Sequence, residues 1–149
     1  TNKQYDIIYL LHVIEHLDNP IKELKRILDY LKPEGKLIIG TPNTFSLERI
    51  LFKKHWDGWD TPRHIYMFNP KNLKKLLIEL GFNKIEVYYE IYSLFKRSSN
   101  NIFTSRDFNT PPSIIRGIST IMNRILSVFL PFVKFSGAVQ IIATKTNKK

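Results

Sequence analysis

Residues 5–17 read YDIIYLLHVIEHL, and this stretch says more about the architecture than any other part of the chain. Residues 5–11 form a short, nearly continuous apolar run, which is typical of a parallel strand buried on both faces rather than of an edge strand. Asn19 and Pro20 follow as a helix cap and a first helical residue. Apolar side chains then recur every three or four residues through residues 21–31, which predicts a helix with one apolar face.

The rest of the chain continues this alternation of strands and helices. Residues 36–41 predict a second buried strand, and the resulting strand–helix–strand unit is parallel and right-handed in nearly all proteins. The later elements that we expect are a short helix at 45–54, a helix at 70–80 capped by Asn69 and closed by Gly81, a strand at 84–90, a long helix at 113–135 and a last strand at 137–144. The pattern predicts an α/β fold.

We expect one partial domain over residues 1–149. Its parts are core strands and helices at 5–90, a helical insertion at 91–136, the last strand at 137–145 and a tail at 146–149.

The chain is 43% apolar and 24% charged, which provides enough apolar mass for one globular domain. It has no cysteine, which excludes a disulfide scaffold, a thiolate nucleophile and a cysteine-based metal site. No apolar run reaches the length of about 20 residues that spans a bilayer, and we find no targeting segment.

The positive charge is concentrated toward the C-terminus. The net charge is +10. Residues 1–50 carry seven basic and seven acidic side chains, whereas residues 101–149 carry seven basic and one acidic. This distribution indicates a basic surface for an anionic partner such as phosphate, nucleic acid or anionic lipid, although a merely soluble basic domain explains the same numbers.

Several short motifs occur in order along the chain. They are Tyr5-Asp6-Ile7-Ile8, Val13-Ile14-Glu15-His16-Leu17, Pro33-Glu34-Gly35, Thr41-Pro42-Asn43, Pro62-Arg63-His64 and Leu80-Gly81-Phe82. Together they resemble the central block of class I S-adenosylmethionine-dependent methyltransferases, above all the subgroup with ubiquinone-pathway O-methyltransferases and bacterial small-molecule methyltransferases. The resemblance implies the C-terminal portion of a doubly wound, Rossmann-like methyltransferase sheet, and S-adenosylmethionine as the cofactor.

The first half of that fold has no counterpart in this chain. In the family resembled, a first strand and a Gly-rich loop hold the cofactor, and the chain contains no G-x-G-x-x-G. Thr1 falls just before the family's fourth strand, so we expect the chain to be the C-terminal half of a methyltransferase and to be inactive alone. A smaller departure is Glu34, which stands where the family usually has a glycine.

Candidate site residues begin where the first strand ends, because ligands of open parallel sheets bind beyond the carboxyl ends of the strands. The resemblance implies that Leu11 and His12 lie beside the methionine part of the cofactor. Packing of Leu11 against the sheet is the alternative for that side chain.

His12, Glu15 and His16 spell H-x-x-E-H, a pattern of one class of zinc proteases. The protease interpretation fails because that motif has to lie within a long helix, whereas here a new helix begins at Pro20, shortly after the motif. Some of the methyltransferases resembled bind a divalent metal at this position and add a histidine where His64 stands, which makes these four residues candidate ligands. Three histidines and one carboxylate suit zinc or manganese better than magnesium. We favour the alternative, in which Glu15 and His16 hydrogen-bond the following loop.

The aromatic loop at 55–68 is the expected substrate wall. Trp56 and Tyr66 are candidates to stack on a substrate ring, and Arg63 is a candidate to pair with a phosphate or a carboxylate. We assign catalysis to His64, which can take a proton from a substrate hydroxyl, and to His16. The alternative is that the aromatic rings belong to the core or a lid and that Arg63 and His64 fix the loop.

The sequence therefore predicts S-adenosylmethionine-dependent methyl transfer, with O-methylation of a small molecule or of a glycan- or lipid-linked precursor. A non-catalytic binding module and an RNA methyltransferase are the alternatives, and nucleic acid ranks lower as a partner because no RNA-binding module is present. We expect a cytoplasmic location. Residues 113–135 combine apolar and basic positions at helical spacing, which suits peripheral membrane contact or a helix that covers the sheet or the site.

Overall fold

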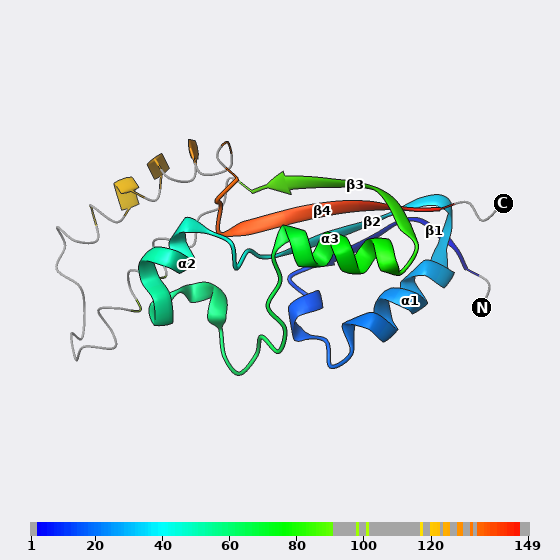
Figure 1. Cartoon of the computed structure of the whole chain (residues 1–149), viewed down its shortest axis with the longest axis horizontal. Coiled ribbons are helices and arrows are strands. Elements are labelled where there is room, and N and C mark those ends of the chain that lie inside the picture. The colour runs from blue at the N-terminus through cyan, green and yellow to red at the C-terminus, as the bar shows by residue number, and fades with distance from the viewer. Residues whose placement is uncertain are drawn as a thin grey trace.

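The computed structural model describes residues 3–90, 98, 101, 117, 120–122, 124–125, 128–129, 132 and 134–146. Figure 1 shows a twisted sheet with helices packed beneath it and both termini at one end. The elements in chain order are β1 (Tyr5–Leu11), the 3-10 turn η1 (Ile14–His16), α1 (Pro20–Tyr30), β2 (Leu31–Pro42), α2 (Leu47–Phe52), the 3-10 turns η2 (Lys53–His55) and η3 (Asp57–Trp59), α3 (Pro70–Glu79), β3 (Phe82–Tyr89) and β4 (Ala138–Lys145).

The four described strands form one sheet in the order β1-β2-β4-β3. β1 pairs with β2 in parallel, as the strand–helix–strand pattern predicted. β4 runs antiparallel to both β2 and β3. Leu11, Pro42 and Tyr89 therefore end their strands at the same edge of the sheet, where Ala138 begins β4.

The helix ends agree with the polar residues that mark them. The side chain of Asn19 accepts a hydrogen bond from the backbone N–H of Lys22 and caps α1. Asn69 and Asn72 form a reciprocal cap at the start of α3. Gly81 follows α3 with φ +100°, a left-handed conformation that only glycine adopts without strain. These local predictions from the sequence are confirmed.

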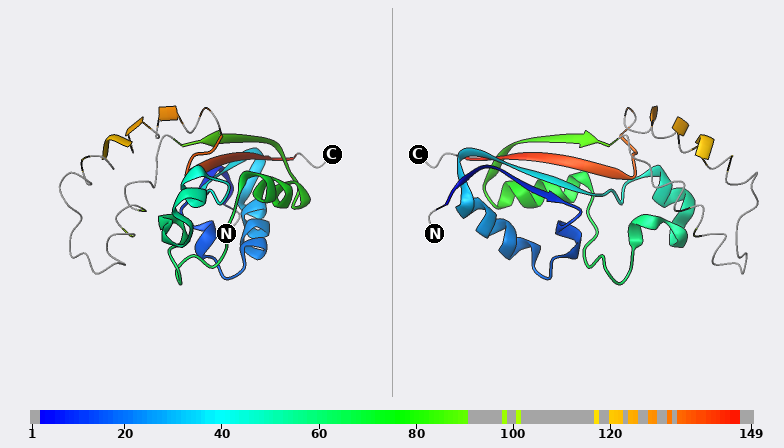
Figure 2. Two further views of the ribbon diagram at one scale, coloured as in Figure 1. Left: turned by 60° about the vertical axis from the view of Figure 1, so that its left-hand side comes forward. Right: turned by 180° about the vertical axis from the view of Figure 1, so that it is seen from behind.

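One core lies between the sheet and the pair of helices α1 and α3. Both helices lie against the same face of the sheet in each view (Figures 1 and 2). The side chains at its centre are fully buried: Leu24 of α1, Leu73 and Leu77 of α3, Leu37 and Ile39 of β2, and Ile141 and Ala143 of β4. This burial is the main driving force that holds the two helices on the sheet.

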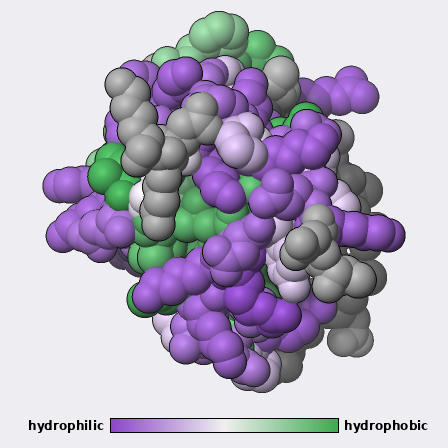
Figure 3. Space-filling view, turned by 90° about the vertical axis from the view of Figure 1, so that its right-hand side faces the viewer, coloured by the Kyte–Doolittle hydropathy of each residue, from purple (hydrophilic) through white to green (hydrophobic). Residues whose placement is uncertain are grey.

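The opposite face of β1 is open, which corrects the prediction of a strand buried on both faces. Tyr5, Ile7, Tyr9 and Leu11 point to that face and are 44–57% exposed. The alternate residues Ile8 and Leu10 pack against the core. An unbroken apolar run predicts two apolar faces, but it does not say whether something in the same chain covers them. Figure 3, which looks at the end where the termini lie, shows an apolar area among hydrophilic side chains.

Most of the expected helix at 113–135 lies outside the described residues. Those described at 117, 120–122, 124–125 and 128–129 are helical. Within the part of the chain that the structure describes, no helix is both long and apolar enough to cross a membrane.

Glu34 gives a first testable prediction because its φ is +60°, in the left-handed region that disfavours residues with a Cβ. We expect Glu34→Gly to raise the free energy of unfolding by about 1 kcal/mol, since relief of backbone strain outweighs the loss of the exposed ion pair with Lys84. Urea unfolding measures the change.

The control is Glu23→Gly in α1, where the same replacement enters a helix and should lower stability by about 1 kcal/mol. Loss of stability in both variants would contradict the strain at Glu34.

Candidate active site

A cavity of about 510 Å³ opens at the carboxyl edge of the sheet. Its described lining comes from the ends of β1, β2 and β3, the start of β4 and the loop that contains η3. The lining residues are His12, His16, Pro42, Asp57, Gly58, Asp60, Arg63, His64, Glu90 and Ala138. The position is the one where open parallel sheets bind ligands.

Glu15 is the buried centre of this edge, with 1% of its surface exposed. Its Oε2 accepts a hydrogen bond from the Thr41 hydroxyl at 3.1 Å, and its Oε1 lies 3.2 Å from Nδ1 of His12. Burial alone would raise the pKa of Glu15, but the hydrogen bonds from His12, the backbone and Thr41 outweigh it and hold this pKa below its usual value. The carboxylate is therefore charged and fixed between the ends of two strands.

The backbone of Glu15 also fastens the loop that follows η3. Its carbonyl oxygen accepts hydrogen bonds from the N–H groups of Ile65 and Tyr66, at 2.8 and 3.1 Å. One residue thus joins β1, β2 and the loop that carries Arg63 and His64. This agrees with the hydrogen-bonding alternative that the sequence analysis favoured for Glu15.

The rings of His16 and His64 lie next to each other in the cavity lining, with ring centroids 4.7 Å apart. Nδ1 of His16 lies 2.8 Å from the carbonyl oxygen of Arg63, and Nδ1 of His64 lies 2.8 Å from that of Gly58. A carbonyl oxygen can only accept, so each Nδ1 carries the proton and donates it. In the Nδ1–H tautomer the lone pair is on Nε2, which can accept a proton or bind a metal. Nε2 of His64 lies 3.8 Å from the Asp60 carboxylate.

The aromatic residues of the loop from Lys53 to His64 pack against one another. Trp56 and Trp59 meet edge to face at 5.3 Å, and the Trp59 indole N–H donates to the carbonyl of Lys53 at 2.6 Å. Gly58 lies directly on the Trp56 ring, where an added Cβ would come within 2.3 Å of the indole. The carbonyl that orients His64 therefore belongs to a residue that has to be glycine.

Arg63 lines the cavity but is already paired. Its guanidinium contacts the Asp60 carboxylate at 2.7 Å. The hydrogen bond from Arg63, which outweighs partial desolvation, lowers the pKa of Asp60 below its usual value. A substrate anion would have to share this cation with Asp60.

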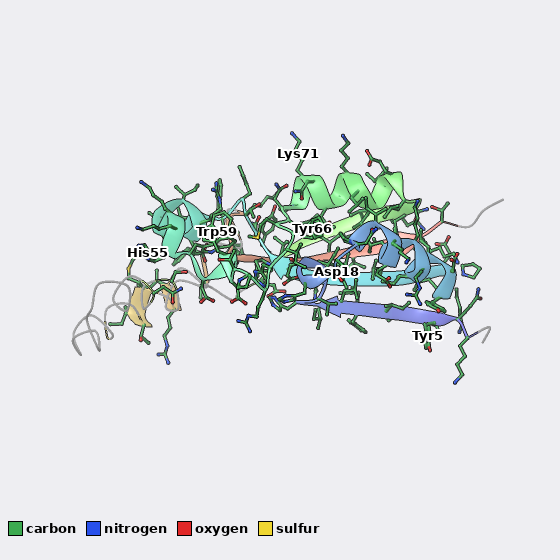
Figure 4. All side chains as sticks on the ribbon, turned by 90° about the horizontal axis from the view of Figure 1, so that it is seen from below. Tyr5, Asp18, His55, Trp59, Tyr66 and Lys71 are labelled. Atoms are coloured by element: carbon green, nitrogen blue, oxygen red, sulfur yellow. The ribbon has the colours of Figure 1, made fainter. Side chains whose placement is uncertain are left out.

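Two predicted substrate residues do not reach the cavity. Trp56 is 1% exposed and packs with Phe52, Trp59 and Met67, which contradicts a stacking role on the substrate and supports the core alternative. Tyr66 is not in the described lining; its hydroxyl donates to the carbonyl of Asp18 at 3.3 Å (Figure 4).

The two residues predicted beside the cofactor lie at the end of β1. His12 is part of the described cavity lining, and the contact of its Nδ1 with the Glu15 carboxylate orients the His12 side chain. Leu11 lies over Gly40 on the open face of the sheet, with its Cδ2 only 3.1 Å from where a Cβ at Gly40 would stand. Leu11 is 51% exposed, so its place beside the cofactor stays a prediction.

Three carboxylates of the described lining, Asp57, Asp60 and Glu90, were not predicted from the sequence. Asp57 and Asp60 flank the second tryptophan of the aromatic loop, so acidic residues within a predicted substrate wall were the available signal. Glu90 follows β3 at the ligand-binding edge, a position that the strand order alone makes apparent.

Three of the four candidate metal ligands come together. One atom each of Glu15, His16 and His64 lies within 4.8 Å of the other two. A carboxylate and two imidazoles are a donor set that zinc accepts, and each imidazole donates its other N–H to a backbone carbonyl, as ligating histidines usually do. The residues therefore fit a divalent metal, while His12 is directed to Glu15 instead.

Comparison with known proteins gives the family of this chain. A family model described as a methyltransferase domain matches residues 1–87. The chain belongs to this methyltransferase family. A curated relative, the ubiquinone biosynthesis O-methyltransferase of Rickettsia canadensis (strain McKiel), is 29% identical over 111 residues, which cover 68% of this chain and 47% of that protein. The chain thus spans about half the length of the curated relative.

Solved methyltransferases share the fold. A S-adenosylmethionine-dependent methyltransferase from Thermotoga maritima superposes with a TM-score of 0.61 at 18% identity, covering 98% of this chain and 58% of that one. A second, from Archaeoglobus fulgidus, gives 0.54 at 20% identity, covering 97% and 61%. The predicted Rossmann-like methyltransferase sheet and the resemblance to class I methyltransferases are confirmed.

Gly58 gives the prediction for this site. We expect Gly58→Ala to lower the free energy of unfolding by about 1–3 kcal/mol, because the new methyl group overlaps the Trp56 ring and the packed loop has to move. Urea unfolding, followed by tryptophan fluorescence, measures the effect.

Gly117→Ala serves as the control, since no atom of the described residues lies within 4 Å of a Cβ at that position. Equal stability of the two variants would show that Gly58 is not held against the indole.

Proposed function

We propose that the complete protein transfers the methyl group of S-adenosylmethionine to a hydroxyl group of a small molecule. The observation that carries this proposal is the His16–His64 pair, whose Nδ1 atoms are held by backbone carbonyls, in a cavity at the ligand-binding edge of a methyltransferase fold. Its support from relatives is the name of the Rickettsia protein, a ubiquinone biosynthesis O-methyltransferase.

Methyl transfer mainly requires that the protein position the acceptor oxygen next to the methyl carbon and provide a proton acceptor. The acceptor oxygen attacks the methyl carbon, the carbon–sulfur bond breaks and the sulfonium becomes the neutral thioether of S-adenosylhomocysteine. The hydroxyl proton passes to Nε2 of His64 or His16. His64 suits this role because only 8% of its side chain is exposed and Gly58 fixes its ring.

The remaining site residues orient the reactants in this proposal. Leu11 and His12 end β1, where we place the methionine part of the cofactor. Arg63, held by Asp60, contacts an anionic or hydroxyl group of the acceptor. In this proposal Tyr66 contacts the acceptor only at the edge of the cavity. Trp56 is buried and contributes by supporting the loop.

We also propose that this chain is the C-terminal half of the enzyme and binds S-adenosylmethionine weakly or not at all alone. Two observations support this: the open face and edge of β1, and a length about half that of the curated relative. The lipid- or glycan-linked acceptor and the peripheral membrane contact belong to the same proposal.

Isothermal titration calorimetry of the 149-residue chain with S-adenosylmethionine tests the division of the cofactor site. We expect no heat of binding at micromolar cofactor, because the chain lacks a glycine-rich loop. Micromolar affinity of the isolated chain would contradict the proposal, and the complete protein under the same conditions is the positive control.

Replacing the two histidines tests the chemistry. We expect His64→Asn in the complete protein to lower kcat at least about 100-fold, with a smaller loss for His16→Asn, because the proton acceptor is removed. Release of S-adenosylhomocysteine from a panel of phenolic and polyol acceptors measures the rate. His55→Asn is the matched control, since His55 is not among the described residues that line the cavity.

Removal of metal by a chelator tests whether Glu15, His16 and His64 bind a metal ion or act through hydrogen bonds and proton transfer alone. A bound divalent metal, held by Glu15, His16 and His64, would polarise the acceptor hydroxyl. We propose instead that hydrogen bonds suffice and expect activity to survive dialysis against EDTA. Activity that is lost on dialysis and restored by zinc or manganese would overturn that assignment, and full activity of both histidine variants would overturn the catalytic role itself.

A further inference from the structure

The surface around α2 exposes large apolar side chains next to cations. Phe45, Ile50 and Leu51 are 51–60% exposed. Phe135 stacks on Phe45 with ring centroids 5.6 Å apart. Lys53, directly after α2, is exposed. We call this set, together with the exposed Lys54 and Lys134, the α2 surface.

A basic hollow lies within the α2 surface. It has a volume of about 720 Å³ and is lined by Arg49, Ile50, Lys53, Lys54, Trp59 and Thr61. The lining thus brings one guanidinium and two ammonium groups together. Three cations around one hollow match a phosphate group better than any neutral ligand.

The α2 surface is fixed in place rather than a loose helix. Ser46 caps α2 by accepting from the Arg49 backbone N–H at 3.1 Å. The backbone N–H of Leu47 donates to the carbonyl of Phe135 at 3.0 Å, so the segment before β4 is joined to the start of α2. Apolar groups that stay exposed on a fixed surface indicate a partner.

Cations predominate among the exposed charges of this surface. Lys53, Lys54 and Lys134 are exposed, whereas Glu48, the acid of α2, is fully buried. Asp60, between Trp59 and Thr61 of the hollow, is paired with Arg63. The sequence from residue 108 to 149 contains six basic side chains and no acidic one. The complementary partner is therefore anionic and presents an apolar layer next to its charges.

We propose that the α2 surface docks onto an anionic lipid bilayer, with a phosphate headgroup in the basic hollow and Phe45, Ile50 and Leu51 at the acyl boundary. Cations beside bulky apolar groups are the composition of interfacial membrane contacts. This inference deepens the membrane contact proposed above, on which it rests, and assigns it to α2 rather than to residues 113–135. Vesicle binding tests it without methyl transfer, so the two proposals can fail separately.

Two other occupants match the surface less well. A second copy in a symmetric pair would set the same patch against itself, and like charges would face each other. A nucleic acid would use the cations but would leave aliphatic Ile50 and Leu51 without a partner, because bases are bound by stacking on aromatic rings.

The test is co-sedimentation of the full-length protein with vesicles of phosphatidylglycerol, and of phosphatidylcholine as the neutral comparison. We expect binding to the anionic vesicles alone. Lys53→Glu, Lys54→Glu should weaken it at least tenfold, because each cation near an anionic surface contributes to the attraction. Ile50→Ser, Leu51→Ser, which alters only exposed side chains of α2, should weaken it several-fold.

Lys71→Glu, Lys74→Glu on α3 is the matched control, with the same change in net charge; Lys71 is labelled on that helix, away from Trp59 and His55, in Figure 4. Far-UV circular dichroism establishes that every variant is folded. Equal losses in the α2 and α3 charge variants would overturn the proposal, because net charge alone would then explain binding. So would equal binding to both vesicles, or RNA binding lost in the same α2 variants.

Discussion

The buried carboxylate of Glu15 is the contact on which the arrangement of the site depends. It takes a hydrogen bond from Thr41 at the end of β2 and faces His12 at the end of β1, while its own carbonyl holds Ile65 and Tyr66. A charged group this deeply buried is tolerated only because its oxygens have partners. Removing either partner would therefore disturb two strands and one loop together, and with them the position of His64.

From this contact the geometry of the cavity follows in steps. The loop fastened to Glu15 brings Arg63 and His64 over the strand ends, and the carbonyl of Arg63 orients His16. Gly58, pressed on Trp56, supplies the carbonyl that orients His64. Two imidazoles with their Nδ1 atoms held by backbone carbonyls result, beside the carboxyl edge of a methyltransferase sheet. The carboxylate of Asp60, 3.8 Å from Nε2 of His64, is the charged group next to this ring.

Much of the fold was predictable because its signals are local. Caps at Asn19 and Asn69, the turn at Gly81 and the apolar periods of the two main helices each depend on neighbouring residues alone. The motif at 13–17 and the histidine at 64 also indicated the site. Burial of Trp56, pairing of Arg63 with Asp60 and exposure of β1 depend on what packs where in three dimensions, which a residue's type and spacing do not reveal.

The central claim is that His16 and His64 carry a proton on Nδ1, which each donates to a backbone carbonyl, and present Nε2 to the cavity. Long-range ¹H–¹⁵N correlation spectra of the histidine rings, recorded on the complete protein above pH 8, measure the tautomer of each ring directly. We predict the Nδ1–H form for both, with His55 assigned separately by substitution. Signals of the Nε2–H form for His16 and His64 would contradict the hydrogen bonds to Arg63 and Gly58 and, with them, the proposed proton transfer.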